Sequence, residues 1–497
     1  MEQTLDRATP ESVGIPSNVI LEWVDELERI APDSHSLMIV RHGRVVAEGW
    51  WAPNAPELPQ TLFSVSKSFT STAVGMAIAE GHFGLDDPVV SFFPTETPAQ
   101  VSPNLAAMKV RHLLAMCTGH DVETVDRATV GEGTHAVRDF LALPVADPPG
   151  THFVYNTAGT YMLSAIIQKQ TGLKLVDYLR PRLFEPLGIE NPTWEQDRSG
   201  VNMGGFGLRV RTEDIARLGQ LYLQKGVWGG KRLISAEWVE SATSVQIANG
   251  PNENPDWTQG YGYQFWRGRH DSFRADGAFG QYCVVVPAQD LVIAMTAGTG
   301  PMHRVLDSLW SIVLPGLQPT PIPEDPAAYE ALKQRLAGLR LIPRLGAASS
   351  ALEASLNGAE FTFDANPFGW RSLRFEFTSS EGALAIFEEG ARRPRRLRFG
   401  RGAWRTSPSA AVRDWPGEHL AVSASWRGQP LAASAAWPRP DCLEVDVCLY
   451  TNAFRYTLTF DFSGPQLRLS ARVNVAFGPT DLGVLVARRE APVAHAR

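Results

Sequence analysis

Cysteine, lysine and long apolar runs are all scarce in this chain of 497 residues. The four cysteines, Cys117, Cys283, Cys442 and Cys448, include no C-x-x-C pair, and no cluster of histidine and cysteine suggests a metal site. Cys442 and Cys448 lie six residues apart in one alternating run, too far along a single strand for a disulfide. The sequence therefore predicts reduced thiols, a reducing compartment, and neither metal nor other cofactor.

No stretch approaches about 18 uninterrupted apolar residues, so we expect no membrane-spanning helix. The segment 1–7 lacks a basic region followed by an apolar run, so we expect no signal peptide and a cytoplasmic location. The net charge of −7 favours neither nucleic acid nor an anionic membrane as a partner. One basic run is predicted to be a solvated strand–turn face; it contains Arg392, Arg393, Arg395, Arg396 and Arg398.

Lysine is rare, and one of the few lysines stands out. The seven lie at positions 67, 109, 169, 174, 225, 231 and 333, and only Lys67 has a serine, Ser64, three positions upstream. We expect a helix from Ser64 to about Glu80, and at this spacing both side chains project from one face of it. A desolvated Lys67 near the positive end of that helix would favour a neutral amine, which can accept the Ser64 proton. The alternative is an N-capping serine followed by a solvated lysine.

Two further stretches could complete a catalytic site. Tyr155 stands just before a second expected helix, 157–171, and its phenol could exchange a proton with Ser64 or Lys67. The stretch 276–282 opens a strand with Gly277 and Gly280, where small residues let a substrate approach the backbone. A backbone N–H from this strand and the N–H of Ser64 itself would form an oxyanion hole.

Strand and helix patterns predict two domains joined by a connector. The first domain, 1–318, combines an expected hairpin around residues 41–44 with later strands at 260–266, 280–286 and 291–296, and helices lie between them. A proline-rich linker and a connecting helix occupy 319–346. The second domain, 347–497, is β-rich, with period-two runs that favour an antiparallel sandwich or barrel: 372–377, 443–449, 454–462 and 466–475. The predicted fold class is α+β.

The combination of Ser64-x-x-Lys67, the Tyr155 motif and the Gly277 strand, in that order and spacing, resembles the serine β-lactamase and penicillin-binding-protein superfamily. The similarity is to the class C β-lactamase-related branch, which includes esterases, D-aminopeptidases and nylon-oligomer hydrolases. It runs from about residue 8 to residue 315. The resemblance implies an antiparallel sheet flanked by helices with a helical subdomain, attack by Ser64, and an acyl-enzyme that water hydrolyses. Lys67 and Tyr155 would handle protons, and which of them is the principal base stays open.

Two departures from this branch bear on the substrate. Class C β-lactamases carry Tyr-x-Asn, whereas this chain has Thr157 in the last position of that motif. Where they carry Lys-Thr-Gly, this chain has Ala275-Asp276-Gly277, so a cation for a β-lactam carboxylate is replaced by an acid nearby. Both departures argue for an ester or neutral amide over a β-lactam. Ala278 is the expected second oxyanion donor.

Other residues are weaker candidates. His120 could border the pocket, as the corresponding segment does in relatives, or it could cap a helix. Thr157, Asp276, Gly277 and Phe279 complete the predicted pocket. The aromatic run 261–266 could line an acyl cleft, although alternating aromatics in a strand more often form core.

The sequence thus predicts a serine hydrolase of esterase type, acting on a small-molecule ester or amide, with the oligomeric state open. Three alternatives remain: a D-residue peptidase, amidase or β-lactamase-like enzyme; an acyltransferase; and a non-catalytic binding protein on the same fold. The purpose of the C-terminal domain is not readable from the sequence.

Overall fold

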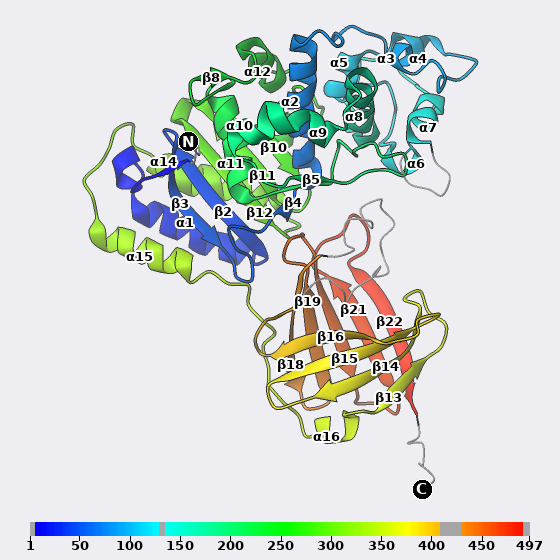
Figure 1. Ribbon diagram of the computed structural model, residues 1–497. Coiled ribbons are helices and arrows are strands. Elements are labelled where there is room, and N and C mark those ends of the chain that lie inside the picture. Colours follow the sequence, from blue (N-terminus) through cyan, green and yellow to red (C-terminus); the bar gives the residue numbers. More distant parts are fainter. Residues whose placement is uncertain (1–4, 129–134, 408–428, 491–497) are drawn as a thin grey trace. The chain divides into compact units, whose positions relative to one another are not determined.

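A computed structural model describes residues 5–128, 135–407 and 429–490. The chain forms two compact units (Figure 1), which are Met1–Trp51 with Ala55–Ala297 and Pro301–Leu339, and Ala52–Asn54 with Gly298–Gly300 and Arg340–Arg497. The expected connecting helix is α15 (Pro326–Ala337), and it belongs to the first unit. It packs on β3 (Arg44–Trp50) and on α1 (Ser17–Ile30), where Arg335 forms ion pairs with Asp25 and Glu28.

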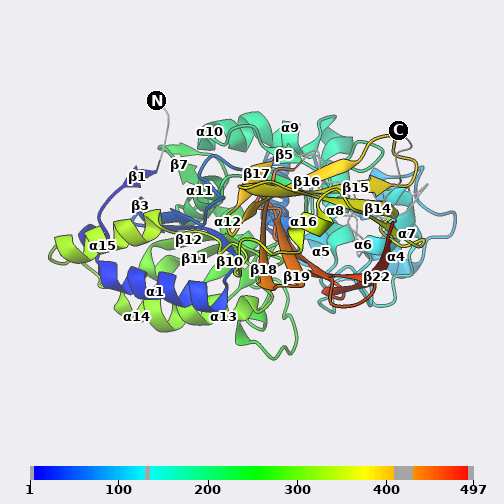
Figure 2. The same cartoon turned by 90° about the horizontal axis from the view of Figure 1, so that it is seen from below.

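The first unit is built on a seven-stranded sheet with the order β1-β3-β2-β12-β11-β10-β9. All neighbouring strands are antiparallel except β1 and β3. Helix α11 (Thr212–Leu223) packs on β2, β11 and β12, while α1 and α13 (Met302–Ser308) lie on the opposite face (Figure 2). The strands are β1 (Asp6–Arg7), β2 (Ser34–Arg41), β3 (Arg44–Trp50), β9 (Trp266–Arg267), β10 (Phe273–Gly277), β11 (Gln281–Val286) and β12 (Leu291–Ala297).

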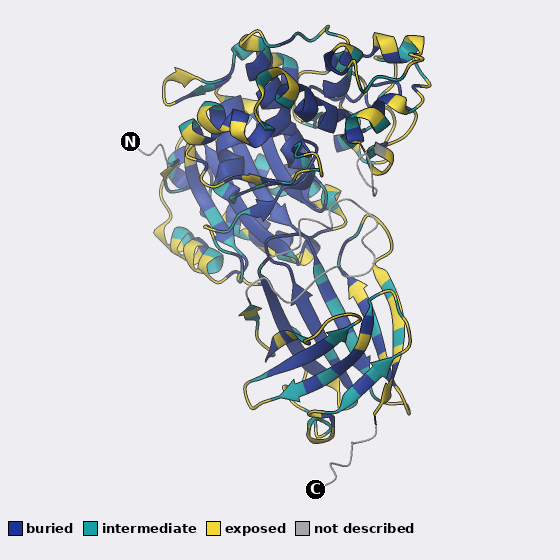
Figure 3. Ribbon diagram, turned by 45° about the vertical axis from the view of Figure 1, so that its right-hand side comes forward, coloured by how far each residue is buried: buried dark blue, intermediate teal, exposed yellow. Residues whose placement is uncertain are grey.

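The central strands are buried along their whole length (Figure 3), because helices cover both faces of the sheet. This explains why the apolar residues of β2, β11 and β12 are consecutive rather than alternating, as in Leu37–Val40 and Cys283–Val286. The expected hairpin is β2 with β3, and the strands expected at 280–286 and 291–296 are β11 and β12.

The strand expected at 260–266 was wrong, because only its last residue lies in a strand, β9. Gly260 and Gln264 have φ angles of +97° and +65°, and the Gly262 N–H donates to the Phe265 carbonyl at 2.8 Å in a tight turn. A Cβ at Gly262 would lie 2.1 Å from the Ala242 carbonyl oxygen. The backbone of this turn therefore approaches residue 242 more closely than any side chain would allow. The aromatic residues Tyr261, Tyr263 and Phe265 lie in this turn and are buried in the core.

Helix α2 (Ser66–Ala79), which follows Ser64, runs through the interior of the first unit and packs on α8 (Thr157–Thr171). Twelve of its residues, 66–77, are buried, so it has no solvent face. Two of its buried hydroxyls donate to backbone carbonyls of distant segments, Ser68 to Gln264 at 2.7 Å and Thr70 to Gly204 at 2.8 Å. These side-chain hydrogen bonds help to hold α2 in the interior, where Lys67 is buried.

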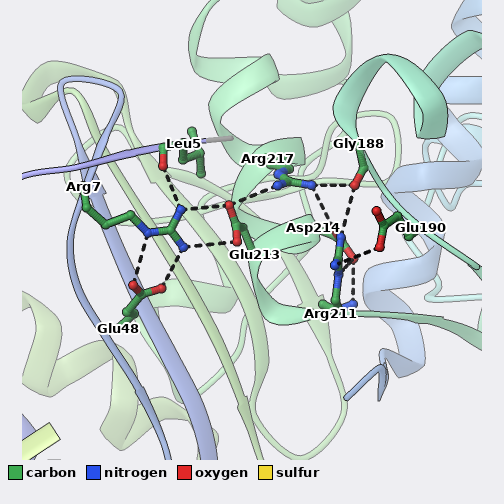
Figure 4. Close-up of polar contacts among 9 residues, drawn as sticks. All are labelled: Leu5, Arg7, Glu48, Gly188, Glu190, Arg211, Glu213, Asp214 and Arg217. Carbon is green, nitrogen blue, oxygen red and sulfur yellow. Dashed lines mark hydrogen bonds and ion pairs between the residues drawn. The ribbon is translucent and has the colours of Figure 1, made fainter. Parts of the chain in front are cut away.

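A polar network ties strand β1 to α11 and to the end of α10 (Glu185–Leu187) (Figure 4). Arg7 donates to both carboxylate oxygens of Glu48, at 3.1 and 2.9 Å, and of Glu213, at 3.2 Å each. Arg217 joins the network through Glu213, at 3.1 Å, and donates to the Gly188 carbonyl at 2.7 Å. These bidentate contacts position the short edge strand, which makes few ladder hydrogen bonds of its own.

The second unit is a closed nine-strand β-barrel, so of the two expected arrangements the barrel is present. The strands follow the order β16-β15-β14-β13-β22-β21-β20-β19-β18, and β16 pairs back onto β18, with β17 alongside. They are β13 (Glu360–Phe363), β14 (Trp370–Phe377), β15 (Glu381–Glu388), β16 (Arg395–Arg401), β17 (Arg405–Ser407), β18 (Leu431–Arg439), β19 (Cys442–Cys448), β20 (Arg455–Asp461), β21 (Leu467–Val473) and β22 (Asp481–Arg489). The four period-two runs fall in β14, β19, β20 and β21.

Aromatic rings meet across the inside of the barrel. Phe375 of β14 lies with its ring centroid 5.2 Å from that of Phe460 of β20 and 5.7 Å from that of Phe361. Because β14 and β20 are not neighbours in the sheet, the contact between Phe375 and Phe460 crosses the interior. Phe375 is fully buried, so the barrel has an aromatic core.

The arginine-rich stretch forms a charged outer face of the barrel, as predicted. Arg396 pairs with Glu376 at 3.1 Å, and Arg398 lies 3.9 Å from Glu381. Arg395 forms an ion pair with Glu388. Glutamates on β14 and β15 therefore compensate this basic run.

All four cysteines are buried as thiols. No helix in residues 5–128, 135–407 or 429–490 is long and apolar enough to cross a bilayer. In that same part of the chain, no group of three or more histidine, cysteine or acidic side chains could hold a metal ion.

Candidate active site

Ser64 lies in a short helical turn, η2 (Phe63–Val65), that leads directly into α2. Phe63 has a φ of +47°, a left-handed conformation that is strained for a bulky aromatic residue. Its ring packs edge to face on Phe279, with centroids 5.4 Å apart, and Phe279 itself has a φ of +67°. Two strained residues therefore support the turn that presents Ser64, and Phe279, predicted to lie in the pocket, is a buried part of this support.

Strand β10 ends at Gly277, directly beside the Ser64 turn. A Cβ at Gly277 would lie 2.4 Å from the Leu62 carbonyl oxygen and 3.2 Å from the Val65 nitrogen, so the close approach of the two backbones requires glycine. Ala278 follows and is half-buried, and its carbonyl accepts a hydrogen bond from Gln281 Nε2 at 3.0 Å. The backbone N–H groups of Ser64 and Ala278 as oxyanion donors stay a prediction.

Lys67 is almost completely buried, with 1% of its surface exposed. Its Nζ lies 3.0 Å from Ser64 Oγ, 2.8 Å from the Gly205 carbonyl oxygen and 3.2 Å from Thr157 Oγ1. Burial lowers the pKa of Lys67 to about 7, although the nearby Glu123 carboxylate raises it. Near neutral pH a large fraction of the amine is therefore neutral, and a neutral amine can accept a proton from Ser64.

Tyr155 is half-buried just before α8, and its side chain interacts with that of Ser64, which lowers the Tyr155 pKa. Lys67 Nζ lies 4.8 Å from the centroid of its ring. Burial raises the pKa of Tyr155 far above its usual value, and the carboxylates of Asp276 and Glu123 raise it further. The phenol therefore keeps its proton at neutral pH, which suits a proton donor or relay better than a phenolate base.

Glu123 is a site residue that the sequence analysis missed. Its carboxylate accepts the Thr157 backbone N–H at 2.9 and 3.0 Å and lies 2.9 Å from Thr157 Oγ1. It also accepts the N–H groups of Thr124 and Val125 at 2.9 and 3.0 Å. Because 34 residues separate Glu123 from Thr157, no local pattern in the sequence indicates this contact.

Asp276 does not present an isolated charge. Its carboxylate accepts from Arg274 Nε at 2.9 Å, and both residues are buried. Burial raises the pKa of Asp276, while the Arg274 guanidinium lowers it. The acid that stands where relatives carry a cation is thus part of a buried ion pair. The i, i+2 spacing, which places both side chains on one face of β10, was a signal for this pair in the sequence.

His120 contacts Asn156, the residue that follows Tyr155. Its Nδ1 is 2.8 Å from Thr118 Oγ1 and 3.4 Å from Asn156 Nδ2, and its ring packs on Phe140 with centroids 5.0 Å apart. Burial lowers the pKa of His120 to about 4, so the imidazole is neutral. These contacts place His120 next to Asn156 rather than next to Ser64.

Four partly exposed aromatic side chains, Phe153, Tyr155, Trp257 and Trp266, form what we call the aromatic wall. Trp266 is central: its ring stacks on Tyr155, with centroids 5.6 Å apart and planes 18° apart, and contacts Phe153 at 5.7 Å and Trp257 at 6.4 Å. The wall includes Tyr155, whose ring centroid lies 4.8 Å from Lys67 Nζ, so it offers an aromatic surface beside the predicted catalytic residues.

The first unit matches a known protein family. A family model described as Beta-lactamase matches residues 28–314, a span that includes Ser64, Lys67, Tyr155 and Gly277. The chain belongs to the beta-lactamase family. This confirms the resemblance to the serine β-lactamase and penicillin-binding-protein superfamily. The match ends before the barrel, so family membership rests on the first unit alone.

Several known proteins are similar to this chain over part or most of its length. The 6-aminohexanoate-dimer hydrolase of Paenarthrobacter ureafaciens is 28% identical over 264 residues, which is 50% of this chain and 66% of that protein, just under two thirds of its length. A D-aminopeptidase of Brucella anthropi is 28% identical over 165 residues, or 31% of each chain. The solved octameric penicillin-binding protein homologue from Pyrococcus abyssi is 16% identical with a TM-score of 0.48, and the match covers 95% of this chain and 98% of that one.

Proposed function

We propose that this protein is a serine hydrolase that cleaves a small ester or amide through an acyl-enzyme on Ser64. One observation carries the proposal: a buried lysine amine, Lys67 Nζ, lies 3.0 Å from Ser64 Oγ. Burying a lysine disfavours its charged form, so a lysine without a role in the interior would be expected to lie in solvent. The arrangement of nucleophile, neutral amine and nearby phenol is the one that activates a serine.

In the proposed reaction, Ser64 Oγ attacks the substrate carbonyl carbon while its proton moves to Lys67 Nζ. The N–H groups of Ser64 and Ala278 stabilise the resulting oxyanion. When the tetrahedral intermediate collapses, the bond to the alcohol or amine breaks, and that leaving group takes a proton through Lys67 and Tyr155. Water then adds to the Ser64 ester, and the acid leaves as Ser64 regains its proton. The resting protonation states favour Lys67 over Tyr155 as the first acceptor.

The surroundings support an uncharged, apolar substrate. The carboxylate of Asp276 is compensated by Arg274, so this position offers no cation for a β-lactam carboxylate and no free anion for an ammonium group. The aromatic wall lies beside Ser64 and suits an alkyl or aryl group. We therefore place esterase activity first, with apolar acyl or alcohol groups preferred.

The proposal is tested with a panel of p-nitrophenyl esters of increasing acyl length, D-alanyl amides and a chromogenic cephalosporin, with Ser64→Ala as the control. We expect ester turnover that Ser64→Ala abolishes, and a serine-reactive fluorophosphonate that adds mass to the peptide containing Ser64. Turnover by Ser64→Ala equal to that of the wild type, or an adduct on another residue, would contradict the assignment.

The amide arms of the panel address the second candidate, an amidase or D-residue peptidase. It is favoured by the names of two relatives, a 6-aminohexanoate-dimer hydrolase and a D-aminopeptidase. An acyltransferase would reveal itself if added alcohols or amines captured the acyl group in competition with water. A binding protein without catalysis would form no covalent adduct with any acylating probe.

Trp257 provides a test of the proposed apolar surface, because it belongs to the aromatic wall without contacting Tyr155 directly. We expect Trp257→Ala to raise KM for long-chain or aryl esters by about 10-fold, the value of one lost apolar contact surface, and to leave acetate esters nearly unchanged. Trp257→Phe should keep most of the affinity. An equal change for short and long esters would show that the wall does not bind the acyl group.

A further inference from the structure

The donors and acceptors around Lys67 raise a question that the distances alone do not answer. A neutral amine has two N–H groups and one lone pair, and only the lone pair can accept the Ser64 proton. Lys67 Nζ has three oxygen neighbours: the Gly205 carbonyl at 2.8 Å, Ser64 Oγ at 3.0 Å and Thr157 Oγ1 at 3.2 Å. Which neighbour faces the lone pair decides whether Lys67 can act as a base.

The Gly205 carbonyl determines the direction of one of the two N–H groups of the Lys67 amine. A carbonyl oxygen only accepts, so one Lys67 N–H must point to it. Two neighbours, Thr157 and Ser64, then remain for one N–H and one lone pair. Both are hydroxyls, and a hydroxyl can either donate or accept.

Glu123 removes this ambiguity at Thr157. A carboxylate only accepts, so the short contact of 2.9 Å between Thr157 Oγ1 and Glu123 Oε2 commits the threonine proton to Glu123. Thr157 Oγ1 can then only accept from Lys67, which uses the second N–H. The lone pair is left for Ser64 Oγ.

We propose that Glu123 is a positioning residue that, by holding the Thr157 hydroxyl proton, directs the lone pair of Lys67 toward Ser64. Glu123 itself does not touch the reacting atoms, and it acts only through Thr157. The inference rests on the proposed hydrolase function and deepens it, because it makes Lys67 the first proton acceptor. It also gives a role to the threonine that replaces asparagine in the Tyr-x-Asn motif: its hydroxyl needs a partner to fix its direction.

The fixed position of Glu123 supports this role. Its carboxylate is anchored by three backbone N–H groups, those of Thr124, Val125 and Thr157, although the side chain is otherwise exposed. A carboxylate anchored in this way cannot turn freely toward solvent. The titratable groups that face Lys67 are Glu123 and Tyr155, and Asp276 lies beyond Tyr155.

The test measures how fast a fluorophosphonate labels Ser64, since this needs no knowledge of the natural substrate. In labelling, a bond forms between Ser64 Oγ and phosphorus, the phosphorus–fluorine bond breaks, fluoride leaves, and the serine proton passes to Lys67. In Glu123→Gln, the amide oxygen takes the backbone N–H groups and the NH₂ donates to Thr157 Oγ1. The threonine proton is then free to occupy the Lys67 lone pair, and we expect labelling to slow by about 10- to 100-fold.

A double-mutant cycle separates positioning from a general loss of stability. Thr157→Val should slow labelling to a similar extent, Thr157→Ser should remain close to the wild type, and Glu123→Gln in the Thr157→Val background should cost little more. The pH midpoint of labelling should also move to lower pH in Glu123→Gln, because the carboxylate that raises the pKa of Lys67 is lost. This shift reports the lost charge, whereas the retained rate of Thr157→Ser and the non-additive cycle are the readouts that a merely structural role would not produce. Asp121→Asn, which removes an exposed acid two positions away, is the matched control.

The outcomes separate this inference from the proposed function. If the wild type is not labelled on Ser64, the proposed function fails and the inference fails with it. If the wild type is labelled and Glu123→Gln matches it, or if the two substitutions have fully independent effects, the inference alone is overturned. If Glu123→Gln does not fold, the comparison of Thr157→Val with Thr157→Ser decides, since loss of the hydroxyl should slow labelling and its retention should not.

Discussion

The amine of Lys67 and the hydroxyl of Ser64 are the residue pair on which the chemistry depends, and burial sets their protonation. Because burial lowers the pKa of Lys67 to about 7, the amine is charged at acidic pH and neutral at alkaline pH. An ammonium group cannot accept the Ser64 proton.

We therefore expect kcat/KM for a p-nitrophenyl ester to rise with pH through a midpoint near 7, the pKa of Lys67 in the free enzyme. The measurement is a pH–rate profile from about pH 5 to about pH 9, with the rate of Ser64→Ala subtracted at each pH. A flat profile over this range would contradict a lysine base.

Tyr155 gives a second prediction at the scale of single residues. Tyr155→Phe keeps the ring that stacks on Trp266 and removes only the hydroxyl, which interacts with Ser64. If Lys67 is the first proton acceptor, we expect kcat to fall by about 10- to 100-fold, because proton delivery to the leaving group is impaired. The residual rate should exceed that of Lys67→Met, measured on the same ester. A Tyr155→Phe variant less active than Lys67→Met would instead make the phenol the principal base.

At the scale of elements, the site depends on the contact between strand β10 and the Ser64 turn. Gly277→Ala would place a Cβ 2.4 Å from the Leu62 carbonyl oxygen, so the strand and the turn must separate. A displacement on the order of 1 Å at reacting groups can cost about 100-fold in rate, and we expect a loss of this size in kcat/KM. A thermal melt should confirm that the protein still folds.

Gly84→Ala is the matched control for this prediction, because the nearest heavy atom beyond its chain neighbours, Asp87 Oδ1, lies 3.6 Å from the added Cβ. It should leave the rate within about 2-fold of the wild type, as expected of a surface substitution. Equal rates for Gly277→Ala and the wild type would show that the close backbone approach is not needed for catalysis.

At the scale of the whole molecule, every predicted catalytic residue belongs to the first unit, whereas the barrel has a core of its own. Phe375→Ala should destabilise the barrel by about 3–5 kcal/mol, the usual cost of removing a buried phenylalanine. We expect an earlier unfolding transition for the barrel and an unchanged kcat at temperatures below that transition, measured by calorimetry and ester turnover. Leu345→Ala, at a residue 74% exposed, should change neither. A fall in kcat for Phe375→Ala below the transition would show that the barrel contributes to catalysis.

Much of the fold could be predicted because local patterns and tertiary packing agree. The helix expected at 157–171 is α8, and the strands expected at 280–286 and 291–296 are present because β-branched runs fit a sheet covered on both faces. The strand at 260–266 failed because Gly260 and Gln264 take positive φ angles that an alternating pattern does not reveal. The sequence left sandwich and barrel open, since closure depends on β16 pairing with β18, a contact between distant segments.

The sequence by itself determined the parts of the site that a short stretch of chain can encode. The spacing of Ser64 and Lys67 places them on one helical turn, Tyr155 precedes the next long helix, and Gly277 ends a strand. Only the tertiary structure decided what surrounds them. Burial of Lys67 lowers its pKa, Arg274 compensates Asp276, and Glu123 reaches Thr157 across 34 positions of sequence. The reason is physical: spacing fixes which residues share an element, whereas desolvation and charge pairing depend on elements that pack together from distant parts of the chain.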